Sequence, residues 1–487
     1  MAKLGLSKAI QCKLEDKVLF LIWGVDGVTS HLSLDLSQIA SLSKKKTKII
    51  FIDSDTVSEE DVIEGKFLKK DIGKKKAIVC QKRCSAAFPN CEITSITRNI
   101  DSTEDFMEML SDNIGYTPLI INLDCDEKNS IIDNVIDNIY EAVSFRYAVD
   151  SEKGYCYFKY KFKGDIITDE FTDEERDFVE FFGFTSKLVN LEIAKTLFLY
   201  IDDFLCENKI RVTGTKLDTT TKYAISKNLG RKLTEYPMVE PKNEPINIEI
   251  GDKVLIIMIG LGGTGGSLAY EVSQAISNSN KEAKLIFIDG DTVENKNLNR
   301  QRFILRDVGS YKAAVTSNRC MNAYDLNIIS STDYLVDENE IYSIMKQFDG
   351  YFPIILGCSD SLKLRYLVIK ALKNIKNHSD LPQDLVYIDA GNDTDGGQVI
   401  CTVFKDGEEV TTDFFKEFPE MLENIDKQKL VTQLSCDELM VSAPQTKGAN
   451  MSAATGIYSC FDDIINERPL KSYNLTFGNK AKRITIG

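Results

Sequence analysis

The stretch that decides the fold is KVLIIMIGLGGTGG, residues 253–266, followed by KLIFIDGDTV, residues 284–293. Each begins with an apolar run of strand length; the first run ends in glycines and the second in Asp289. The residues between the two runs have the apolar spacing of a helix. A strand, a helix and a strand in this order predict a βαβ unit, and hence an α/β domain with a mainly parallel sheet flanked by helices.

The same pattern occurs earlier in the chain. KVLFLIWGVDG from Lys17 and KIIFIDSDTV from Lys48 align with the two runs above at a constant offset of 236 residues. Further on, the segment from Thr185 resembles the segment from Gln445 at an offset of about 260. The sequence is therefore predicted to contain two homologous copies, of which the second has gained roughly 24 residues in its middle.

The repeat predicts three regions: a first domain at 1–205, a connector at 206–250 and a second domain at 251–487. The connector is rich in threonine and then carries three prolines, which fix φ and remove backbone donors. We expect it to be partly ordered and both domains to be Rossmann-like.

Composition excludes several classes of protein. With 487 residues, of which 43% are hydrophobic, the chain can bury large cores and is not disordered. A net charge of −15 disfavours a sequence-independent grip on nucleic acid or anionic lipid. The chain has only two histidines, His31 and His378, which disfavours a multi-histidine metal centre and a histidine-based triad. Chemistry must come from carboxylates, cations, backbone amides or a thiol.

Targeting signals are lacking in the sequence. The amino terminus has no apolar core of signal-peptide length, and no stretch reaches the roughly 18 apolar residues of a membrane span. The 12 cysteines include no CxxC pair. These features predict a cytoplasmic protein with no membrane contact, in which most cysteines are reduced thiols.

Gly260, Gly262 and Gly265 form a GxGxxG motif between the first strand and the helix. Such a turn brings a phosphate close to backbone amides at the start of a helix. Asp289 lies 24 residues beyond Gly265, where it is placed to accept from ribose hydroxyls. The motif alone fits a dinucleotide oxidoreductase as well as an ATP-binding enzyme.

A third apolar run at 353–357 predicts another central strand, and Asp360 follows its carboxyl end. Ligands bind at that end of the strands in open α/β sheets. The alternative role for Asp360 is a helix N-cap.

The continuation after the second strand is IDGDTVENKNLNRQRFILRDVGSYKA, residues 288–313, followed by GCSD and DAGNDTDGGQV. With these motifs the sequence resembles the ThiF/HesA/MoeB family, the adenylylating core shared with ubiquitin-activating enzymes. The resemblance covers most of 253–465 strongly, and 17–205 as a degenerate copy.

This resemblance implies an enzyme that uses ATP and Mg²⁺. The implied nucleotide-binding residues are Gly260, Gly262, Gly263, Gly265, Asp289, Asp291, Asn297, Arg300 and Lys312. It implies catalytic roles for Arg300, Lys312 and Asp360, with Asp360 as the magnesium ligand. Ser361 stands where the family usually has asparagine. Attack of a carboxylate on the α-phosphate builds negative charge, so fixed cations and a metal placed there lower the barrier.

Cys436 occupies the position of a crossover cysteine in related enzymes. As a thiolate it could take an activated acyl group as a thioester, or sulfur as a persulfide; the alternative is an inert loop thiol. Cys401 and Cys460 lie in apolar settings typical of a core. Many relatives bind zinc through two CxxC pairs, which this chain lacks, so we expect no zinc. The nearest cysteine cluster lies in the first copy: Cys80, Cys84 and Cys91.

The first copy has lost its phosphate site. The changes at the aligned positions are Gly262 to Asp26, Gly265 to Thr29, Asn297 to Asp61 and Arg300 to Glu64. A like charge about 4 Å from a phosphate costs on the order of 4 kcal/mol at an effective dielectric near 20, so ATP should not bind. In the family the active unit is a dimer of such domains, and in ubiquitin-activating enzymes one member is inactive. We therefore expect a fused pseudodimer, without excluding a higher oligomer.

The family commonly supplies a phosphate-contacting arginine from the segment before the partner domain. Residues 1–16 contain lysines but no arginine. Either a lysine substitutes for it, or Arg211 or Arg231 in the connector does.

The function expected from the sequence is ATP-dependent adenylylation of a carboxylate, with release of pyrophosphate. The expected acceptor is the carboxyl terminus of a small ubiquitin-like or sulfur-carrier protein, and transfer to Cys436 could follow. The alternatives are adenylylation of a peptide, a modified tRNA or another small acceptor, and a non-catalytic nucleotide-binding adaptor. An NAD-dependent oxidoreductase is a further alternative, which the NLNRQ segment opposes.

Overall fold

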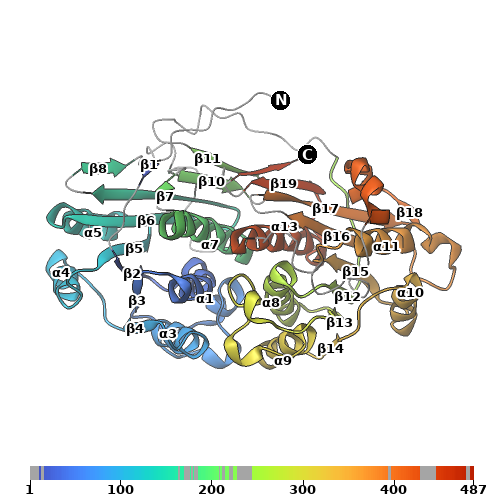
Figure 1. Ribbon diagram of the computed structural model, residues 1–487, viewed down its shortest axis with the longest axis horizontal. Helices are drawn as coiled ribbons and strands as arrows, with labels where there is room; N and C mark the ends of the chain where they lie inside the picture. Colours follow the sequence, from blue (N-terminus) through green and yellow to red (C-terminus); the bar gives the residue numbers. More distant parts are fainter. Residues whose placement is uncertain are drawn as a thin grey trace. The chain divides into compact units, whose positions relative to one another are not determined.

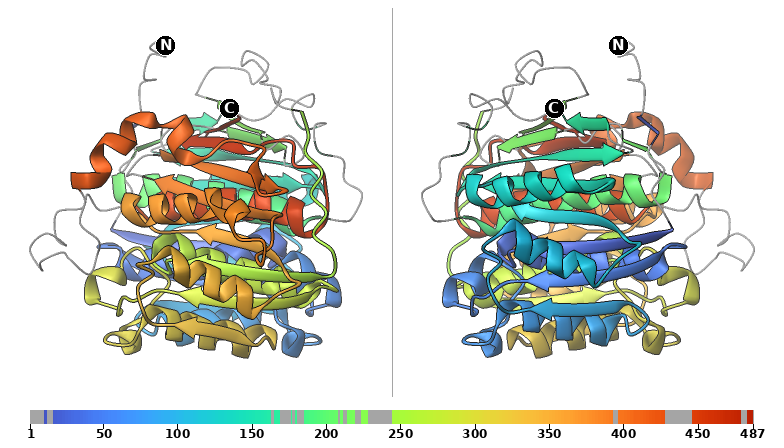
Figure 2. Two further views of the ribbon diagram at one scale, coloured as in Figure 1. Left: turned by 90° about the vertical axis from the view of Figure 1, so that its right-hand side faces the viewer. Right: turned by 90° about the vertical axis from the view of Figure 1, so that its left-hand side faces the viewer.

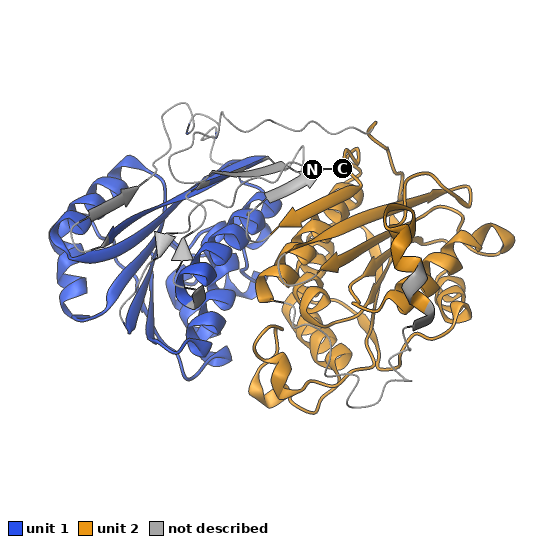
Figure 3. Cartoon of the chain, turned by 45° about the horizontal axis from the view of Figure 1, so that its top comes forward, with its two compact units in different colours: residues 1–238, 480–483 blue, residues 239–479, 484–487 orange. Residues whose placement is uncertain are grey.

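The computed structural model describes residues 10–11, 16–162, 165–168, 176, 179, 185–207, 209–210, 214–218, 223–227, 244–392, 396–427, 446–478 and 483–486. The chain folds into two compact units (Figure 3). Unit 1 comprises residues 1–238 and 480–483, and unit 2 comprises residues 239–479 and 484–487.

Unit 1 alternates strands and helices along the chain (Figure 1). Its strands are β1 (Ile10–Gln11), β2 (Lys17–Trp23), β3 (Lys46–Ile52), β4 (Glu92–Ile96), β5 (Thr117–Leu123), β6 (Glu141–Val149), β7 (Lys153–Phe162), β8 (Asp165–Thr168), β9 (Lys209–Ile210), β10 (Gly214–Asp218) and β11 (Tyr223–Lys227). Its helices are α1 (Gly27–Leu42), α2 (Glu59–Glu64), η1 (Lys69–Asp71), α3 (Lys76–Ala87), α4 (Thr103–Ser111), α5 (Asp126–Asn138), α7 (Lys187–Asp202) and η2 (Asp203–Glu207).

The main sheet of unit 1 is parallel over five strands, in the order β4-β3-β2-β5-β6. Antiparallel β7 follows β6, and its other edge pairs with β10 near one end and β8 near the other. β11 pairs with β10, while β1 and β9 form a separate two-stranded sheet.

Unit 2 is built in the same way. Its strands are β12 (Lys253–Ile259), β13 (Glu282–Ile288), β14 (Ile328–Ser331), β15 (Phe352–Gly357), β16 (Leu385–Asn392), β17 (Gly396–Lys405), β18 (Glu408–Glu409) and β19 (Asn474–Gly478), and β20 (Arg483–Ile486) lies near the carboxyl terminus. Its helices are α8 (Gly263–Asn278), η4 (Asn295–Asn297), η5 (Leu305–Asp307), α9 (Lys312–Tyr324), α10 (Glu338–Gln347), α11 (Leu362–Lys373), η6 (Ile375–Asn377), α12 (Phe414–Glu417), η7 (Pro419–Lys427) and α13 (Lys447–Ile465).

The strand order of unit 2 repeats that of unit 1. The parallel part runs β14-β13-β12-β15-β16, then comes antiparallel β17, whose other edge pairs with β19 near one end and β18 near the other. The predicted fold class, two tandem Rossmann-like regions with mainly parallel sheets, is therefore confirmed.

Both faces of each sheet are covered by helices, which is why the central strands appear in the sequence as continuous apolar runs. In unit 2, Leu255, Ile257 and Ile259 of β12 pack in one cluster with α10 and α11. In unit 1, the cluster around Leu19 and Leu21 of β2 includes α4 and α5. The left view of Figure 2 looks onto α10 and α11, and the right view onto α4 and α5. Two other helix groups also pack together, α8 with α9 and α13, and α1 with α3 and α7.

Residues 206–250, predicted as a partly ordered connector, contain β9, β10 and β11 in their described part. β10 extends the sheet of unit 1 beyond β7. Within the described residues, no helix is both long and apolar enough to cross a membrane.

Candidate active site

The turn between β12 and α8 carries the glycine motif of unit 2. Gly260 has a φ of +89°, a left-handed conformation that favours glycine, and its N–H donates to the carbonyl of Ile288 at 2.9 Å. A Cβ atom on Gly265 would lie 1.9 Å from the Gly260 carbonyl oxygen. A Cβ atom on Gly263 would lie 2.0 Å from the side-chain nitrogen of Asn450 on α13. The packing of the protein itself therefore requires these three glycines.

Gly262 is different, because a Cβ atom there would have room, with its nearest neighbour 3.6 Å away at Nε2 of Gln301. It is the N-cap residue of α8, and no side chain of the described residues caps this helix. The first N–H groups of a helix lack intrahelical partners and carry the positive end of its dipole. The missing side chain at Gly262 thus leaves a helix end suited to an anion.

Three parallel strands end at the same edge of the sheet. β12 lies between β13 and β15 and is parallel to both. The chain passes from β12 to one neighbour and later to the other, which makes this edge the switch point where ligands bind in open α/β sheets. The residues that follow the three strands, Gly260, Asp289 and Asp360, are therefore brought to one edge, as the sequence predicted.

Asp289 follows β13 and braces the glycine turn. Its Oδ2 accepts the N–H of Leu261 at 2.5 Å, and its Oδ1 accepts the N–H of Asp291 at 2.8 Å. Burial raises the pKa of Asp289 above its ordinary value, although the ammonium of Lys312 opposes this. Each carboxylate oxygen has a second lone pair, so Asp289 can also accept from a ligand hydroxyl.

Lys312 is the first residue of α9 and is buried. Its Nζ lies 2.7 Å from Oδ2 of Asp291, and the hydroxyl of Tyr334 donates to Oδ1 of Asp291 at 2.6 Å. Burial alone would raise the pKa of Asp291, but Lys312 and Tyr334 outweigh burial and lower it. Asp291 therefore stays ionised and fixes the ammonium of Lys312 beside the glycine turn.

Asn297 and Arg300 lie in the segment that begins with η4. Asn297 is buried, and its Oδ1 accepts the N–H of Glu294 at 2.8 Å, which closes the turn. Arg300 is half-buried. Its guanidinium has no ion-pair partner in the part of the chain that the structure describes, so its charge is available to an anion.

Asp360 is exposed and stands three residues beyond β15. The N-cap of α11 is Ser361, whose hydroxyl accepts the N–H of Leu364 at 3.3 Å. The alternative role of Asp360 as a helix cap is therefore wrong. The Asp360 carboxylate is directed to solvent at the edge where the three strands end.

The segment that carries Asp360 is anchored by Arg365, a buried residue of α11. Its Nη2 donates to the carbonyl of Ser359 at 3.3 Å and to that of Ala390 at 2.8 Å. The guanidinium also pairs with the buried carboxylate of Asp389 and stacks 4.2 Å above the centroid of the Phe414 ring. These contacts join the segment after β15 to the end of β16.

The cysteines that the structure describes form no metal site. Among the described residues, no group of three or more histidine, cysteine, aspartate or glutamate side chains is arranged to hold a metal ion. Burial raises the pKa of Cys80 to about 12 and that of Cys84 to about 11. Cys401 and Cys460 are buried, as predicted for core residues. Three sequence candidates lie outside the described residues: Cys436, Arg211 and Arg231.

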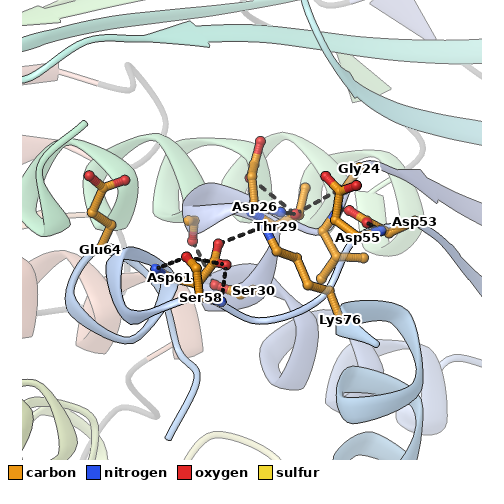
Figure 4. A network of polar contacts seen from close by, with 12 residues as sticks. Gly24, Asp26, Thr29, Ser30, Asp53, Asp55, Ser58, Asp61, Glu64 and Lys76 are labelled. Carbon is orange, nitrogen blue, oxygen red and sulfur yellow. Dashed lines mark hydrogen bonds and ion pairs between the residues drawn. The ribbon is translucent and has the colours of Figure 1, made fainter. Parts of the chain in front are cut away.

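Figure 4 shows the matching edge of unit 1, where polar groups of the protein contact one another. Asp26 is the N-cap of α1: its Oδ1 accepts the N–H of Thr29 at 3.0 Å and its Oδ2 accepts the hydroxyl of Tyr147 at 2.5 Å. The Thr29 hydroxyl donates to the carbonyl of Gly24 at 2.8 Å, where a glycine in unit 2 leaves no side chain. A carboxylate of the protein thus occupies the helix end.

The cation of unit 1 is also engaged. Lys76 lies 2.7 Å from Asp61, which takes the aligned place of the asparagine in unit 2. Glu64, in the aligned place of the arginine, accepts the hydroxyl of Thr185 at 2.5 Å. Burial raises the pKa of Glu64. Lys76 and Glu64 are thus both held by side chains of unit 1.

Sequence reasoning missed three residues at this edge: Tyr334, Arg365 and Asn450. Tyr334 lies in the segment after β14 and Arg365 on α11, and no motif indicated either residue. Asn450 had a signal, because Asn190 stands at the aligned position of the first copy. A Cβ atom on Gly27 would lie 2.1 Å from the Asn190 side-chain nitrogen, which repeats the contact in unit 2.

A mainly parallel sheet with a glycine turn at its switch point defines a Rossmann-like domain. Residues 252–475 match the sequence model of the ThiF family and form a ThiF family domain. The resemblance expected from the motifs of the second copy is thereby confirmed. No curated protein sequence matches the chain.

Similar solved structures include selenomethionine PaaA, at 13% identity and a TM-score of 0.34. They also include MccB of E. coli with AMPCPP and MccA, at 16% identity and a TM-score of 0.36. MccB of E. coli with ATP matches at 15% identity and a TM-score of 0.36. Each match covers 45% of this chain and 65% of the other, so the chain spans about two thirds of the length of these proteins.

Proposed function

We propose that the ThiF family domain of unit 2 is an ATP-dependent adenylyltransferase that activates a carboxylate. The observation that carries the proposal is the uncapped start of α8, with Arg300 unpaired in the described part of the chain and Lys312 fixed near the same turn. Two cations and a helix end at one edge suit a polyphosphate. The match to the ThiF family over 252–475 supports the same function.

The residues present fit a nucleotide. The turn after β12 offers backbone N–H groups that can donate to phosphate oxygens, and Asp289 can accept ribose hydroxyls beside the turn. Asn297 fixes the segment from which Arg300 extends, so that a cation stands near the phosphates. We assign nucleotide binding to Gly260, Gly262, Gly263, Gly265, Asp289, Asp291, Asn297, Arg300 and Lys312.

Magnesium fits the same edge. Mg²⁺ usually takes one or two protein carboxylates together with substrate phosphates and water. Asp360 is exposed and belongs to no ion pair in the described residues, so it can serve as that carboxylate. When bound, Mg²⁺ would neutralise charge on the phosphates.

In the proposed reaction, a carboxylate oxygen of the acceptor attacks the α-phosphorus of ATP. The bond from the α-phosphorus to the bridging oxygen breaks, and pyrophosphate leaves with its electron pair. Negative charge grows on the oxygens near the α8 helix end, where Arg300 and Lys312 stabilise it more in the transition state than in the ground state. The product is an acyl adenylate.

For the acceptor, we propose the carboxyl terminus of a small ubiquitin-like or sulfur-carrier protein. The thiolate of Cys436 could then attack the acyl carbon and release AMP, forming a thioester. A peptide or another small acceptor is the alternative. We further propose that unit 1 is the degenerate, inactive ThiF-like copy of a fused pseudodimer, and that the protein is cytoplasmic.

Calorimetric titration with MgATP, with NAD as comparator, tests the proposal. We expect one MgATP per chain, no response to NAD, and at least about 10-fold weaker MgATP binding in Asp360→Asn, since a charged contact is lost. Asp126→Asn, a change in an exposed aspartate after β5 of unit 1, is the matched control and should bind like the wild type. Exchange of labelled pyrophosphate into ATP would then identify the acceptor.

Failure of the wild type to bind MgATP would overturn the proposal and favour a non-catalytic adaptor. Binding of NAD in place of ATP would favour an oxidoreductase. If MgATP binds but no carboxyl-terminal peptide or carrier protein supports pyrophosphate exchange, the proposed nucleotide site stands and the proposed acceptor is wrong.

A further inference from the structure

The two units share one backbone frame at the edge of the sheet. In unit 2, the carboxylate of Asp289 accepts the N–H of Leu261 and of Asp291, and the carbonyl of Asp291 accepts the N–H of Lys312 at 2.9 Å. In unit 1, Asp53 accepts the matching N–H groups of Val25 and Asp55 at 2.6 and 2.7 Å. The Lys76 N–H donates to the Asp55 carbonyl at 3.0 Å. This frame does not distinguish the two units.

The side chains attached to the frame do distinguish them. In unit 2, the carboxylate of Asp291 is held from one side by Lys312 at 2.7 Å and from the other by the Tyr334 hydroxyl at 2.6 Å. In unit 1, Asp55 is exposed and the lysine pairs instead with Asp61. Within the described residues, the relay of tyrosine, aspartate and lysine therefore exists only in the unit whose helix end is open.

The residue at the place of Tyr334 differs in a way that removes this relay. In the strand pairing, Ser331 lies opposite Ile288 and Ile96 lies opposite the equivalent Ile52, so that Asn99, three residues further on, stands in the place of Tyr334. Asn99 is exposed, and its side chain carries no hydroxyl. This position of unit 1 thus supplies no hydroxyl to that carboxylate.

Gly290 makes room for the tyrosine. A Cβ atom on Gly290 would lie 2.7 Å from the ring of Tyr334, so the ring rests directly on the backbone between Asp289 and Asp291. Unit 1 has Ser54 at the aligned position. The ring and the glycine together hold the hydroxyl at one oxygen of Asp291.

We propose that Tyr334 is a positioning residue for Lys312 that acts through Asp291; the inference rests on the proposed function. Its hydroxyl donates to Oδ1 of Asp291 and fixes the orientation of the carboxylate, which directs Oδ2 to the ammonium. An ammonium has three donors, so Lys312 can give its others to phosphate oxygens. Without the hydroxyl, the carboxylate of Asp291 can turn, so the ammonium is no longer held at one place beside the phosphates.

The test compares Tyr334→Phe with the wild type in binding of MgATP and of adenosine, which has no phosphates. We expect MgATP to bind about 10-fold more weakly, because a hydrogen bond to a charged group is lost, while adenosine binds within about 2-fold. The control is Tyr351→Phe, which removes a hydroxyl that donates to Glu282 outside the site, and it should change neither ligand.

A second variant tests the path of the effect. In Asp291→Asn the carboxylate is gone, so adding Tyr334→Phe should weaken MgATP binding no further. If Tyr334→Phe weakens the binding of MgATP and of adenosine equally, or weakens neither, the inference is overturned while the proposed function stands. Failure of the wild type to bind MgATP would instead overturn the proposed function itself.

Discussion

The starts of α1 and α8 follow equivalent strands, yet one is closed and the other open. Gly24 and Gly260 both have positive φ, and Gly27 and Gly263 both lie against an asparagine. These two packed glycines of the motif are thus kept in both units.

The two units differ at the other two glycines of the motif, Gly262 and Gly265. Gly262 has room for a side chain, and unit 1 has Asp26 there, which caps its own helix. Thr29 replaces the packed Gly265 because its hydroxyl takes the nearby carbonyl as a partner. If the start of α8 binds phosphate as proposed, the comparison explains how such a site is lost while the fold is kept: the helix end receives an anion of its own.

The largest effect should come from transferring that anion to unit 2. In Gly262→Asp, a carboxylate about 4 Å from the phosphate costs on the order of 4 kcal/mol, so MgATP should bind about 1000-fold more weakly in calorimetry. The unfolding temperature should stay constant or rise slightly, since aspartate is a good N-cap.

Gly262→Ala is the matched control for this change, because it adds a methyl group without charge. It should bind MgATP within about 3-fold of the wild type, since the Cβ atom has room. Equal binding by the aspartate and alanine variants would show that the start of α8 is not the phosphate site.

A smaller effect should separate the two lysines. Lys312→Met removes a fixed cation from the proposed site and should weaken MgATP binding about 100-fold. Lys76→Met should leave binding unchanged and lower the free energy of unfolding by about 2 kcal/mol, because Asp61 loses its ion pair. Weaker MgATP binding in Lys76→Met would mean that unit 1 has a nucleotide site after all.

The closed helix end of unit 1 should contribute stability and no binding. Asp26→Ala removes the N-cap of α1 and leaves the buried hydroxyl of Tyr147 without that acceptor, so the free energy of unfolding should fall by about 2 kcal/mol. Denaturant unfolding measures this loss. In combination with Tyr147→Phe the losses should not add, because both changes break the same contact; full additivity would contradict the assigned hydrogen bond.

The smallest effect concerns Glu64 and pH. Its pKa is raised by burial, so the folded protein releases this proton at a higher pH than the unfolded chain, and stability is lost as pH rises through that interval. Glu64→Gln should remove this loss. Above the pKa of Glu64 in the folded protein, the free energy of unfolding of the variant should exceed that of the wild type by less than about 1 kcal/mol. Below the ordinary pKa of glutamate, this difference between variant and wild type should be smaller. The same change at exposed Glu59 controls for net charge. A constant difference across pH would contradict the shift.

Much of the fold could be predicted because it depends on local sequence. The apolar runs of β2 and β12 are buried on both faces, and a constant offset of 236 residues aligns the first βαβ regions of the two units by their residues alone. The cap formed by Asp26 and Thr29 also follows a short-range pattern. Such signals lie within a few residues of the feature that they predict.

The site was predictable only in part, because its contacts join distant segments. The sequence identified Lys312 and Asp291 but not their contact with Tyr334, which lies 43 residues beyond Asp291. Nor could it decide whether Asp360 or Ser361 caps α11, since both residue types serve as N-caps. Both the contact of Tyr334 and the N-cap of α11 follow only from the three-dimensional structure.

The open start of α8 also predicts a low free energy of local opening for this turn when no ligand is bound, at the place where binding is proposed. Amide groups without a partner exchange their hydrogens through small openings, whereas Asp26 covers the matching amide in unit 1. A bound nucleotide would supply the missing acceptors, so that the last step in ordering this turn and the binding of substrate form one linked equilibrium. In unit 1, the Asp26 side chain supplies the acceptor at the start of α1, so the order of that turn depends on no small molecule.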